Sequence, residues 1–279
     1  MSATPPLFDR PALAAHRARI RDDALFLHRL ALDEVQDRLS MVNKGFTAPA
    51  IVTPAPQIWR DAFPGAVLAP DDETLALGPD AHDLVIHAMG LHWAGDPVGQ
   101  LIQSRRALRP DGFFLGLALG GQTLAELRAV LAQAEAEVTG GLSPRVAPMA
   151  EIRDMGGLLQ RAGLTLPVAD SHAVTVAYRD LTHLMHDLRA MGETNALSDR
   201  LRRPTRRALF DRAAALYAEH YPAEGGGIRA TFETICLTGW SPADNQPKPL
   251  RPGSAQARLA EALGSKEIKL PDWPMREMR

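Results

Sequence analysis

Two histidines and a tryptophan at the end of an apolar strand are the side chains of this sequence best suited to acid–base chemistry. His87 falls inside the apolar run Leu84–Ala88, and His92 and Trp93 follow shortly after it. An imidazole changes charge near neutral pH and can act as a general base, so His92 and Trp93 are candidate catalytic residues. A second interpretation is that His87 packs under a lid while His92 and Trp93 shape a pocket wall. The second is favoured, because no Asp or Glu is spaced locally to orient either ring.

The histidines do not form a metal-binding pattern. His82, His87 and His92 are spaced five residues apart. Side chains of one strand alternate between its faces, so this odd spacing puts successive histidines on opposite sides. The single cysteine, Cys236, excludes a multi-cysteine metal site and an intrachain disulfide, and its apolar neighbours predict a buried strand thiol. No metal is therefore predicted.

A strand-helix-strand unit positions these side chains. The apolar strands Leu84–Ala88 and Phe113–Leu119 are separated by an amphipathic helix and a turn at Arg109–Gly112. That order is typical of a parallel sheet. Open α/β sheets bind their ligands in loops that follow the strands, which here is the segment Met89–Asp96.

Several blocks of the sequence resemble a known family. The runs DLVIHAMGLHW and LRPDGFFLGLALGGQTLAELR are similar to the second half of a class I S-adenosylmethionine (SAM) methyltransferase domain. The narrower resemblance is to the mitochondrial complex I assembly factor 5 family and its bacterial relatives, and it is carried by FDRPALAAHRARIR, GGLSPRVAP, DLRAMGETNAL and ATFETICLTGW. The resemblance implies an α/β fold: a truncated Rossmann-like methyltransferase sheet with helices on both faces and a helical lid insertion.

The first half of the domain departs from the family pattern. The family has a glycine-rich loop there, because a side chain would block the approach of the backbone to SAM. The corresponding segment Asn43–Trp59 has one glycine, Gly45. About 30 residues separate Ile51 from Asp83, which is room for roughly one strand-helix step rather than three. At least one step must be missing or severely shortened, so SAM is a possible but doubtful cofactor.

An acidic stretch resembles the one that precedes the fourth strand of the family's fold. The run Asp71–Leu77 resembles the family's acidic stretch beside the adenine of SAM, although a solvated turn explains it equally well. The resemblance implies a set of candidate cofactor-binding residues: Asp71, Asp72, Leu75, His87 and Met89.

A second block, Arg189–Ala196, combines a glycine with polar residues. Gly192 marks a helix end, and Glu193 and Asn195 follow it in a turn. The block is a hallmark of the resembling family, which implies that Gly192, Glu193 and Asn195, together with Arg145, position a substrate or the lid. The alternative is a glycine C-cap followed by polar turn residues.

The run Arg200–Arg207 is strongly basic. Arg202, Arg203 and Arg206 are candidates for contact with an acidic protein partner or a membrane surface, whereas most charge runs are simply solvated. A net charge of -2 and the lack of aromatic residues among these arginines argue against nucleic acid as a partner.

Composition bounds the class of protein. The 46% hydrophobic content is enough for a buried core, no apolar run reaches the roughly 18 residues that span a bilayer, and the beginning of the sequence lacks a signal-peptide pattern. With its single cysteine, the chain is predicted to be cytoplasmic, with no transmembrane segment and with peripheral membrane contact left open. The predicted organisation is an N-terminal helical segment over 1–45, a Rossmann-like core over 46–180, a helical lid insertion over 181–227, a final sheet strand over 228–240 and an extended tail over 241–279.

Two classes of function remain from the sequence. The first is a protein-binding assembly or maturation factor for a respiratory complex, with a subunit of that complex as a candidate partner. It would keep the sheet and the lid but bind SAM weakly or not at all. The alternative is an active SAM-dependent methyltransferase, or an arginine hydroxylase as the family resemblance implies, that acts on a protein side chain. The missing glycine loop favours the first class.

Overall fold

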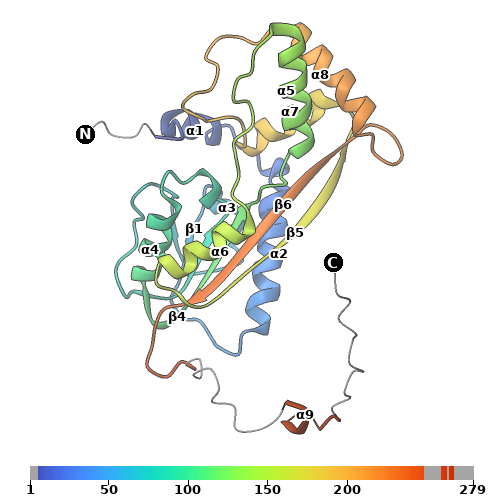
Figure 1. The fold of residues 1–279 in the computed structure, drawn as a ribbon. Coiled ribbons are helices and arrows are strands. Elements are labelled where there is room, and N and C mark those ends of the chain that lie inside the picture. Colours follow the sequence, from blue (N-terminus) through green and yellow to red (C-terminus); the bar gives the residue numbers. More distant parts are fainter. Residues whose placement is uncertain (1–5, 248–258, 263, 267–279) are drawn as a thin grey trace, which may run out of the picture. The chain divides into compact units, whose positions relative to one another are not determined.

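A six-stranded mixed sheet forms the centre of the protein (Figure 1). The computed structural model describes residues 6–247, 259–262 and 264–266. The strand order is β2-β1-β3-β4-β6-β5; β1 to β4 run parallel, and β6 is antiparallel to both of its neighbours. The strands are β1 (Pro49–Val52), β2 (Val67–Ala69), β3 (His82–Ala88), β4 (Leu108–Leu119), β5 (Thr165–Tyr178) and β6 (Ile228–Trp240).

The first lobe of the sheet is shortened, as the sequence predicts. Only the short helix α3 (Pro56–Arg60) and the three-residue strand β2 lie between β1 and β3. β1 therefore pairs directly with both β2 and β3, and β2 forms the edge. The α/β fold with a truncated parallel half is confirmed.

Helices cover both faces of the sheet, because successive strand residues point to opposite sides. On one face, Ile51, Ile86 and Leu115 pack in a core with α2 (Phe26–Met41) and α3. On the other, Val85 and Phe114 pack against α4 (Pro97–Ala107) and α6 (Ile152–Arg161). The parallel strands are thus buried on both faces, which explains their continuous apolar runs.

The turn predicted at Arg109–Gly112 is instead the beginning of β4. Leu108 already pairs with His82, and the ladder then shifts register before Phe113 pairs with Leu84. Asp111 adopts a φ of 61°, and its N–H donates to the carbonyl of Ser241. The Pro-Asp-Gly sequence therefore forms an irregularity inside a strand, because hydrogen-bonding partners are available on both sides.

The lid helices lie at the far end of a two-stranded ribbon (Figure 1). β6 pairs with β4 only over residues 234–240, but it pairs with β5 as far as residue 228. α7 (Leu181–Met191) and α8 (Arg207–His220) follow β5, and α8 packs on α5 (Ala125–Thr139), which follows β4. The helices predicted to form a lid, α7 and α8, thus pack over the segment that continues from the end of β4.

A buried ion pair holds the loop after α5 in place. Arg145 donates from Nε and Nη2 to the two carboxylate oxygens of Glu135, at 2.9 and 2.6 Å, and from Nη1 to Thr205. Ser143 adds further hydrogen bonds to Glu135. The Arg145 hydrogen bonds, with those of Ser143, outweigh burial and lower the pKa of Glu135 to about 2.

The end of α7 packs tightly on the link between α1 (Arg10–Arg17) and α2. Gly192 ends the helix with a φ of 80°, and the carbonyl of Ala190 accepts from the N–H of Arg21. A Cβ on Gly192 would lie 2.9 Å from Cγ1 of Ile20. Glycine is required here for its backbone conformation and for the close contact.

The tail predicted over 241–279 falls largely outside the described residues. Contacts divide the chain into residues 1–243 and 244–279, and the described part of the second unit contains the short helix α9 (Leu259–Ala262). No described helix is long and apolar enough to cross a membrane.

Gly192→Ala should destabilise the protein by about 2 to 3 kcal/mol, because alanine is strained at positive φ and its Cβ would overlap Ile20. Gly140→Ala is the matched control, since Gly140 also ends a helix at positive φ but has no atom within 4 Å of an added Cβ. That control should lose only about 1 kcal/mol. Urea unfolding measures both changes, and equal losses would contradict the proposed contact.

Glu135 should make the unfolding free energy of the protein fall at acidic pH. Its folded pKa lies below the usual 4.5, so its contribution is present above pH 4.5 and is lost as the pH falls toward 2. From about pH 6 to about pH 3, the wild type should lose about 2 kcal/mol more unfolding free energy than Glu135→Gln. Glu224→Gln, which removes an exposed carboxylate, should retain the wild-type pH dependence. An unchanged slope in Glu135→Gln would sink the assignment.

Candidate functional site

Two cavities lie at the edge of the sheet where the parallel strands end. The first, of about 690 Å³, lies between α1 and the segments 53–56 and 68–72 that follow β1 and β2. The second, of about 300 Å³, lies between the end of β4, α5 and the lid. The first is where the resembling family would bind its cofactor.

Asp71, the buried acidic residue of the first cavity, forms an ion pair with a residue of α1. Arg17 donates from Nη1 and Nη2 to Oδ1 and Oδ2 of Asp71, at 2.5 and 2.7 Å. Asp71 is only 4% exposed, and its carboxylate packs against the backbone of Gly90. Arg10 donates to the carbonyl of Asp71 at 2.7 Å. Both carboxylate oxygens are therefore already bound within the protein.

The loop after β1 has no glycine to receive a ligand. It reads Thr53-Pro54-Ala55-Pro56 and leads directly into α3. Gly45, the one glycine of this region, precedes β1 and so lies at the opposite edge of the sheet. With no glycine in this loop and Asp71 paired to Arg17, these residues do not fit the amino-acid end and the adenine end of SAM as those of the family do.

The other predicted cofactor residues are dispersed. The Asp72 side chain is exposed beside Arg10, 3.5 Å from its Nη2. Leu75 packs with Val52 in a small core, and Met89 is 2% exposed in the main core at a φ of 58°. Only Asp71 and Asp72 of the predicted set line the first cavity.

His87 lies under α4, not under the lid. Gln100 donates from Nε2 to the carbonyl of Asp72 at 2.5 Å, which leaves its Oε1 to accept from Nε2 of His87 at 2.9 Å. That chain of hydrogen bonds assigns the proton of the neutral ring to Nε2. Burial lowers the pKa of His87, and its Nδ1 has no partner among the described residues. His87 is a neutral core residue in this structure.

His92 and Trp93 are both held by one carboxylate from the lid. Oε2 of Glu193 accepts from Nε1 of Trp93 at 2.7 Å and from Nε2 of His92 at 3.2 Å. Nδ1 of His92 in turn accepts from the N–H of Leu119 at 3.4 Å. With its proton on Nε2 and Nδ1 already occupied, His92 has no free position from which to act as a base.

Glu193 remains ionised in this buried position. Burial alone would raise its pKa, but the His92 ring, the hydrogen bonds from His92 and Trp93 and the charge of Arg17 hold the pKa of Glu193 below its usual value. Both donors bind Oε2, so Oε1 has no donor among the described residues. Glu193 can therefore receive a cation or a hydrogen-bond donor in the second cavity.

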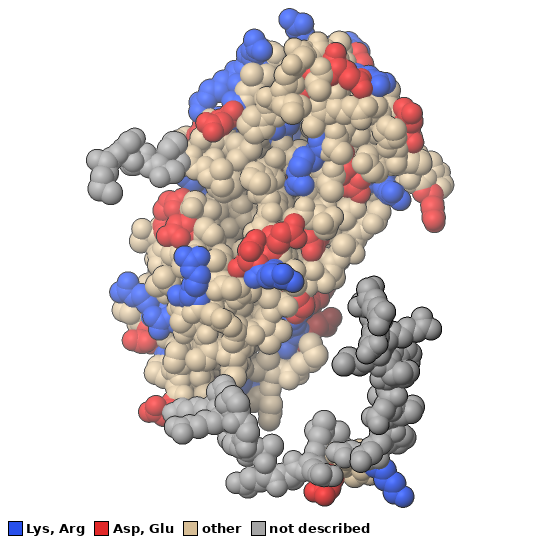
Figure 2. Space-filling model, viewed as in Figure 1, with Lys and Arg blue, Asp and Glu red and all other residues tan. Residues whose placement is uncertain are grey.

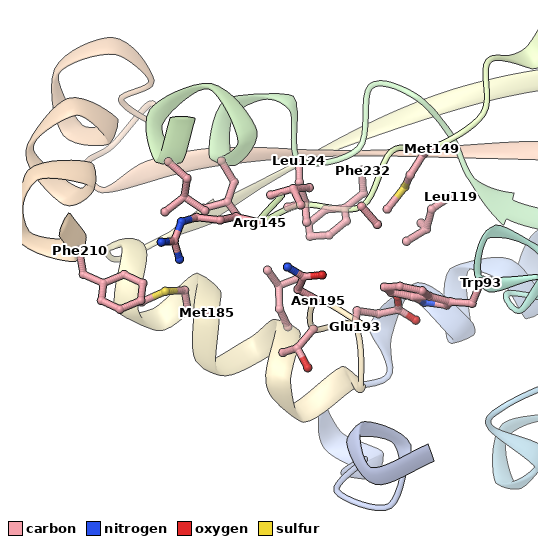
Figure 3. A pocket seen from close by; sticks show the side chains of 16 residues that line it. Trp93, Leu119, Leu124, Arg145, Met149, Met185, Glu193, Asn195, Phe210 and Phe232 are labelled. Atoms are coloured by element: carbon pink, nitrogen blue, oxygen red, sulfur yellow. The ribbon is translucent and has the colours of Figure 1, made fainter. Parts of the chain in front are cut away.

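The second cavity brings together predicted residues that are far apart in the sequence. Trp93, Arg145, Glu193 and Asn195 all line it, and most of the remaining wall is apolar. Figure 3 shows Glu193 beside Trp93 and Arg145 toward Phe210 and Met185, with Asn195 between them. The structure thus places three of the four candidate substrate or lid residues in the wall of one cavity, and Gly192 lies next to it in the sequence. The walls resemble those of a small-ligand pocket with few polar groups.

Gly192 and Asn195 hold the backbone around the cavity through a helix end and through hydrogen bonds to the main chain. Gly192 turns the chain so that Glu193 points inward. Asn195 donates from Nδ2 to the carbonyl of Pro144 at 2.7 Å and accepts from the N–H of Leu197 at 3.0 Å. It therefore joins the loop after α5 to the turn after α7.

The sequence could not reveal how the rings are oriented. Glu193 orients His92 from 101 residues away, and Arg17 reaches Asp71 across 54. The apolar wall, including Leu124, Phe210 and Phe232, was also missed. These residues come from the residue before α5, from α8 and from β6, and each belongs to an apolar pattern that any core element shows.

The basic segment is only partly free. Arg200 and Arg202 form ion pairs with Asp9, at 2.9 and 3.2 Å, while Arg203 and Arg206 are exposed and form no ion pair with another described residue. Figure 2 shows basic side chains gathered over the end of the molecule that carries the loop before α8. Within the described part of the chain, no group of three or more His, Cys, Asp or Glu side chains is arranged to hold a metal ion.

Comparison with known proteins gives relatives along most of the chain. No family model matches. Arginine-hydroxylase NDUFAF5, mitochondrial, from Danio rerio is 39% identical over 202 residues, which are 71% of this chain and 62% of that protein. The human protein of the same name is 39% identical over 199 residues, 70% of this chain and 56% of that protein. A malonyl-[acyl-carrier protein] O-methyltransferase from Laribacter hongkongensis is 33% identical, over 64% of this chain and 57% of that protein.

The chain thus spans about three fifths of the length of the curated relatives it matches. Among solved structures, a methyltransferase-like protein from Bacillus halodurans aligns with a TM-score of 0.42 at 13% identity, over 70% of this chain and 82% of that one. YcgJ from Bacillus subtilis aligns with a TM-score of 0.42 at 12% identity, with the same coverage.

These relatives correct the prediction of location. The cytoplasmic assignment is wrong by this comparison, because the NDUFAF5 proteins that match most of the chain are mitochondrial by name. The prediction rested on the single cysteine and the lack of a signal-peptide pattern, and neither feature distinguishes one reducing compartment from another. Over most of its length, the chain is thus similar to the NDUFAF5 proteins and to a malonyl-[acyl-carrier protein] O-methyltransferase, and its mixed sheet with helices on both faces is an α/β fold of the Rossmann-like kind.

Proposed function

We propose that this chain is a protein-binding assembly or maturation factor for a respiratory complex of the complex I type, with weak or lost binding of SAM. The observation that carries the proposal is the bidentate ion pair of Asp71 with Arg17 in the corner where the family binds its cofactor. The resemblance to the complex I assembly factor 5 family and the match to NDUFAF5 proteins support the choice of partner.

Energetics support the loss of the cofactor. The adenine end of SAM could hydrogen-bond to Asp71 only after Arg17 had left, and breaking a buried pair typically costs about 3 to 5 kcal/mol. Micromolar binding is worth only about 8 kcal/mol in total. The prolines after β1 further remove the backbone approach on which the family's affinity for SAM depends.

The second cavity is the proposed contact site for the partner. It is apolar, it lies at the ligand-binding edge of the sheet, and its one buried carboxylate, Glu193, is already ordered by His92 and Trp93. Arg203 and Arg206 on the loop before α8 would add long-range attraction to an acidic partner or a membrane surface. A partner side chain with an apolar stem and a polar or cationic tip matches this cavity.

Modification of an arginine is the second candidate. The NDUFAF5 relatives are arginine-hydroxylases by name, and Oε1 of Glu193, which no described donor occupies, could bind a guanidinium. Loss of a hydroxylated arginine from the respiratory complex when this protein is deleted, measured by peptide mass spectrometry, would favour this candidate over a purely binding role.

Calorimetric titration with SAM, and with its demethylated product, should give no heat at millimolar ligand. The reason is that both oxygens of Asp71 are bound by Arg17 and no glycine loop follows β1. A class I methyltransferase with an intact glycine loop, titrated under the same conditions, is the positive control. Binding at micromolar strength, about -8 kcal/mol, would contradict the proposed loss of the cofactor.

Deletion of the gene should reduce the assembled respiratory complex several-fold, measured on native gels of the organism's own membranes. The wild-type chain should restore it, whereas Glu193→Gln should not, because the substitution removes the buried charge while keeping a group that can accept from His92 and Trp93. Glu224→Gln, on an exposed loop, is the matched control and should restore assembly. An unchanged complex in the deletion strain would overturn the proposal.

A further inference from the structure

The outer edge of β5 is an open end of the sheet. β5 is the last strand in the order, and no described strand pairs with its outer side. An edge strand presents unpaired N–H and C=O groups, so it is a template for another strand. At 14 residues, β5 is longer than most strands in globular proteins.

The usual protection of an edge is confined to one end of β5. Pro167 and a register shift lie between Thr165 and Val168, and from Val168 to Tyr178 the strand pairs regularly with β6. That regular part contains no lysine and no proline. Val168, at its start, has 55% of its surface exposed although it is apolar. Proteins normally protect such an edge with charge or irregular backbone.

The sequence of this part is symmetric in its chemistry about Ser171. In both directions from Ser171, the first residues are Asp170 and His172, the next are two alanines, and the third are Val168 and Val174. Two copies of the strand, paired antiparallel with Ser171 opposite Ser171, would therefore place Asp170 opposite His172 twice and Val168 opposite Val174 twice. Pairs of complementary side chains that face each other across two strands, polar with polar and apolar with apolar, stabilise a strand pair.

We propose that two copies of this chain form a two-fold symmetric dimer by antiparallel pairing of their β5 strands, centred on Ser171. The pairing joins two six-stranded sheets into one continuous sheet and uses the same surface on both copies, as a two-fold interface requires. Ser171 and His172 are exposed and available for it.

Arg38 orders the Asp170 carboxylate, which would face His172 of the other copy. It donates to both oxygens of Asp170, at 2.8 and 2.5 Å, from α2. The carboxylate is thereby held in one position on the face of β5 that also carries His172. An ordered acceptor loses less side-chain freedom when a partner binds it.

A cysteine at the symmetry axis tests the register. Ser171→Cys should form an intermolecular disulfide in dilute oxidant, since residues paired directly across antiparallel strands have Cα atoms about 4.5 to 5.5 Å apart, within disulfide range. Thr175→Cys is exposed on the same face of the same strand, but its two copies would lie roughly 25 Å apart and should not cross-link. The natural Cys236 is buried, with its pKa raised by burial to about 12, and does not interfere.

Charge at His172 tests the interface without cysteines. Sedimentation velocity of the full chain should show a concentration-dependent dimer. His172→Glu should weaken it about tenfold, because each glutamate would face Asp170 of the other copy, whereas His172→Lys at the same exposed position should preserve it. A monomer at all accessible concentrations, equal cross-linking of the two cysteine variants, or equal effects of glutamate and lysine would overturn the proposal.

Discussion

The burial of one carboxylate organises the ligand edge of this protein. Asp71 is nearly inaccessible to water, so it requires a cation, and Arg17 of α1 supplies it through two hydrogen bonds. That requirement fixes α1 over the ends of β1 and β2. Just before α1, Phe8 forms an isolated strand-like bridge with Leu197, which ties the same segment to the turn after α7. One ion pair therefore links the shortened lobe to the lid.

The two cavities differ in what their walls offer a ligand. The first contains no glycine loop and its acidic residue Asp71 is bound by arginines, whereas the second holds an ordered carboxylate beside an apolar wall. The short lobe between β1 and β3 leaves the second half of the sheet intact, because β3, β4 and β6 form their own ladders and cores. One site of a fold can in this way differ without change at another.

Sequence reasoning located the sheet, the missing step and most of the lid helices, since these follow from apolar periodicity and chain length. The predicted strand Leu84–Ala88 lies inside β3, and Leu181–Met191 is exactly the span of α7. It could not find the partners of Asp71 and His92, which come from segments 54 and 101 residues away. Nor could it place His87, whose neighbour Gln100 decides its protonation. Local pattern predicts elements, whereas the charge state of a side chain depends on contacts between distant elements.

The ribbon of β5 and β6 has a consequence for the second cavity. Residues 228–233 of β6 lie beyond its pairing with β4 and are paired, among the described strands, with β5. On their other side, the carbonyls of Thr231 and Glu233 accept hydrogen bonds from the N–H groups of Leu124 and Gly120, in the segment between β4 and α5. These hydrogen bonds set Leu124 beside Phe232, so two distant parts of the sequence form one continuous part of the cavity wall.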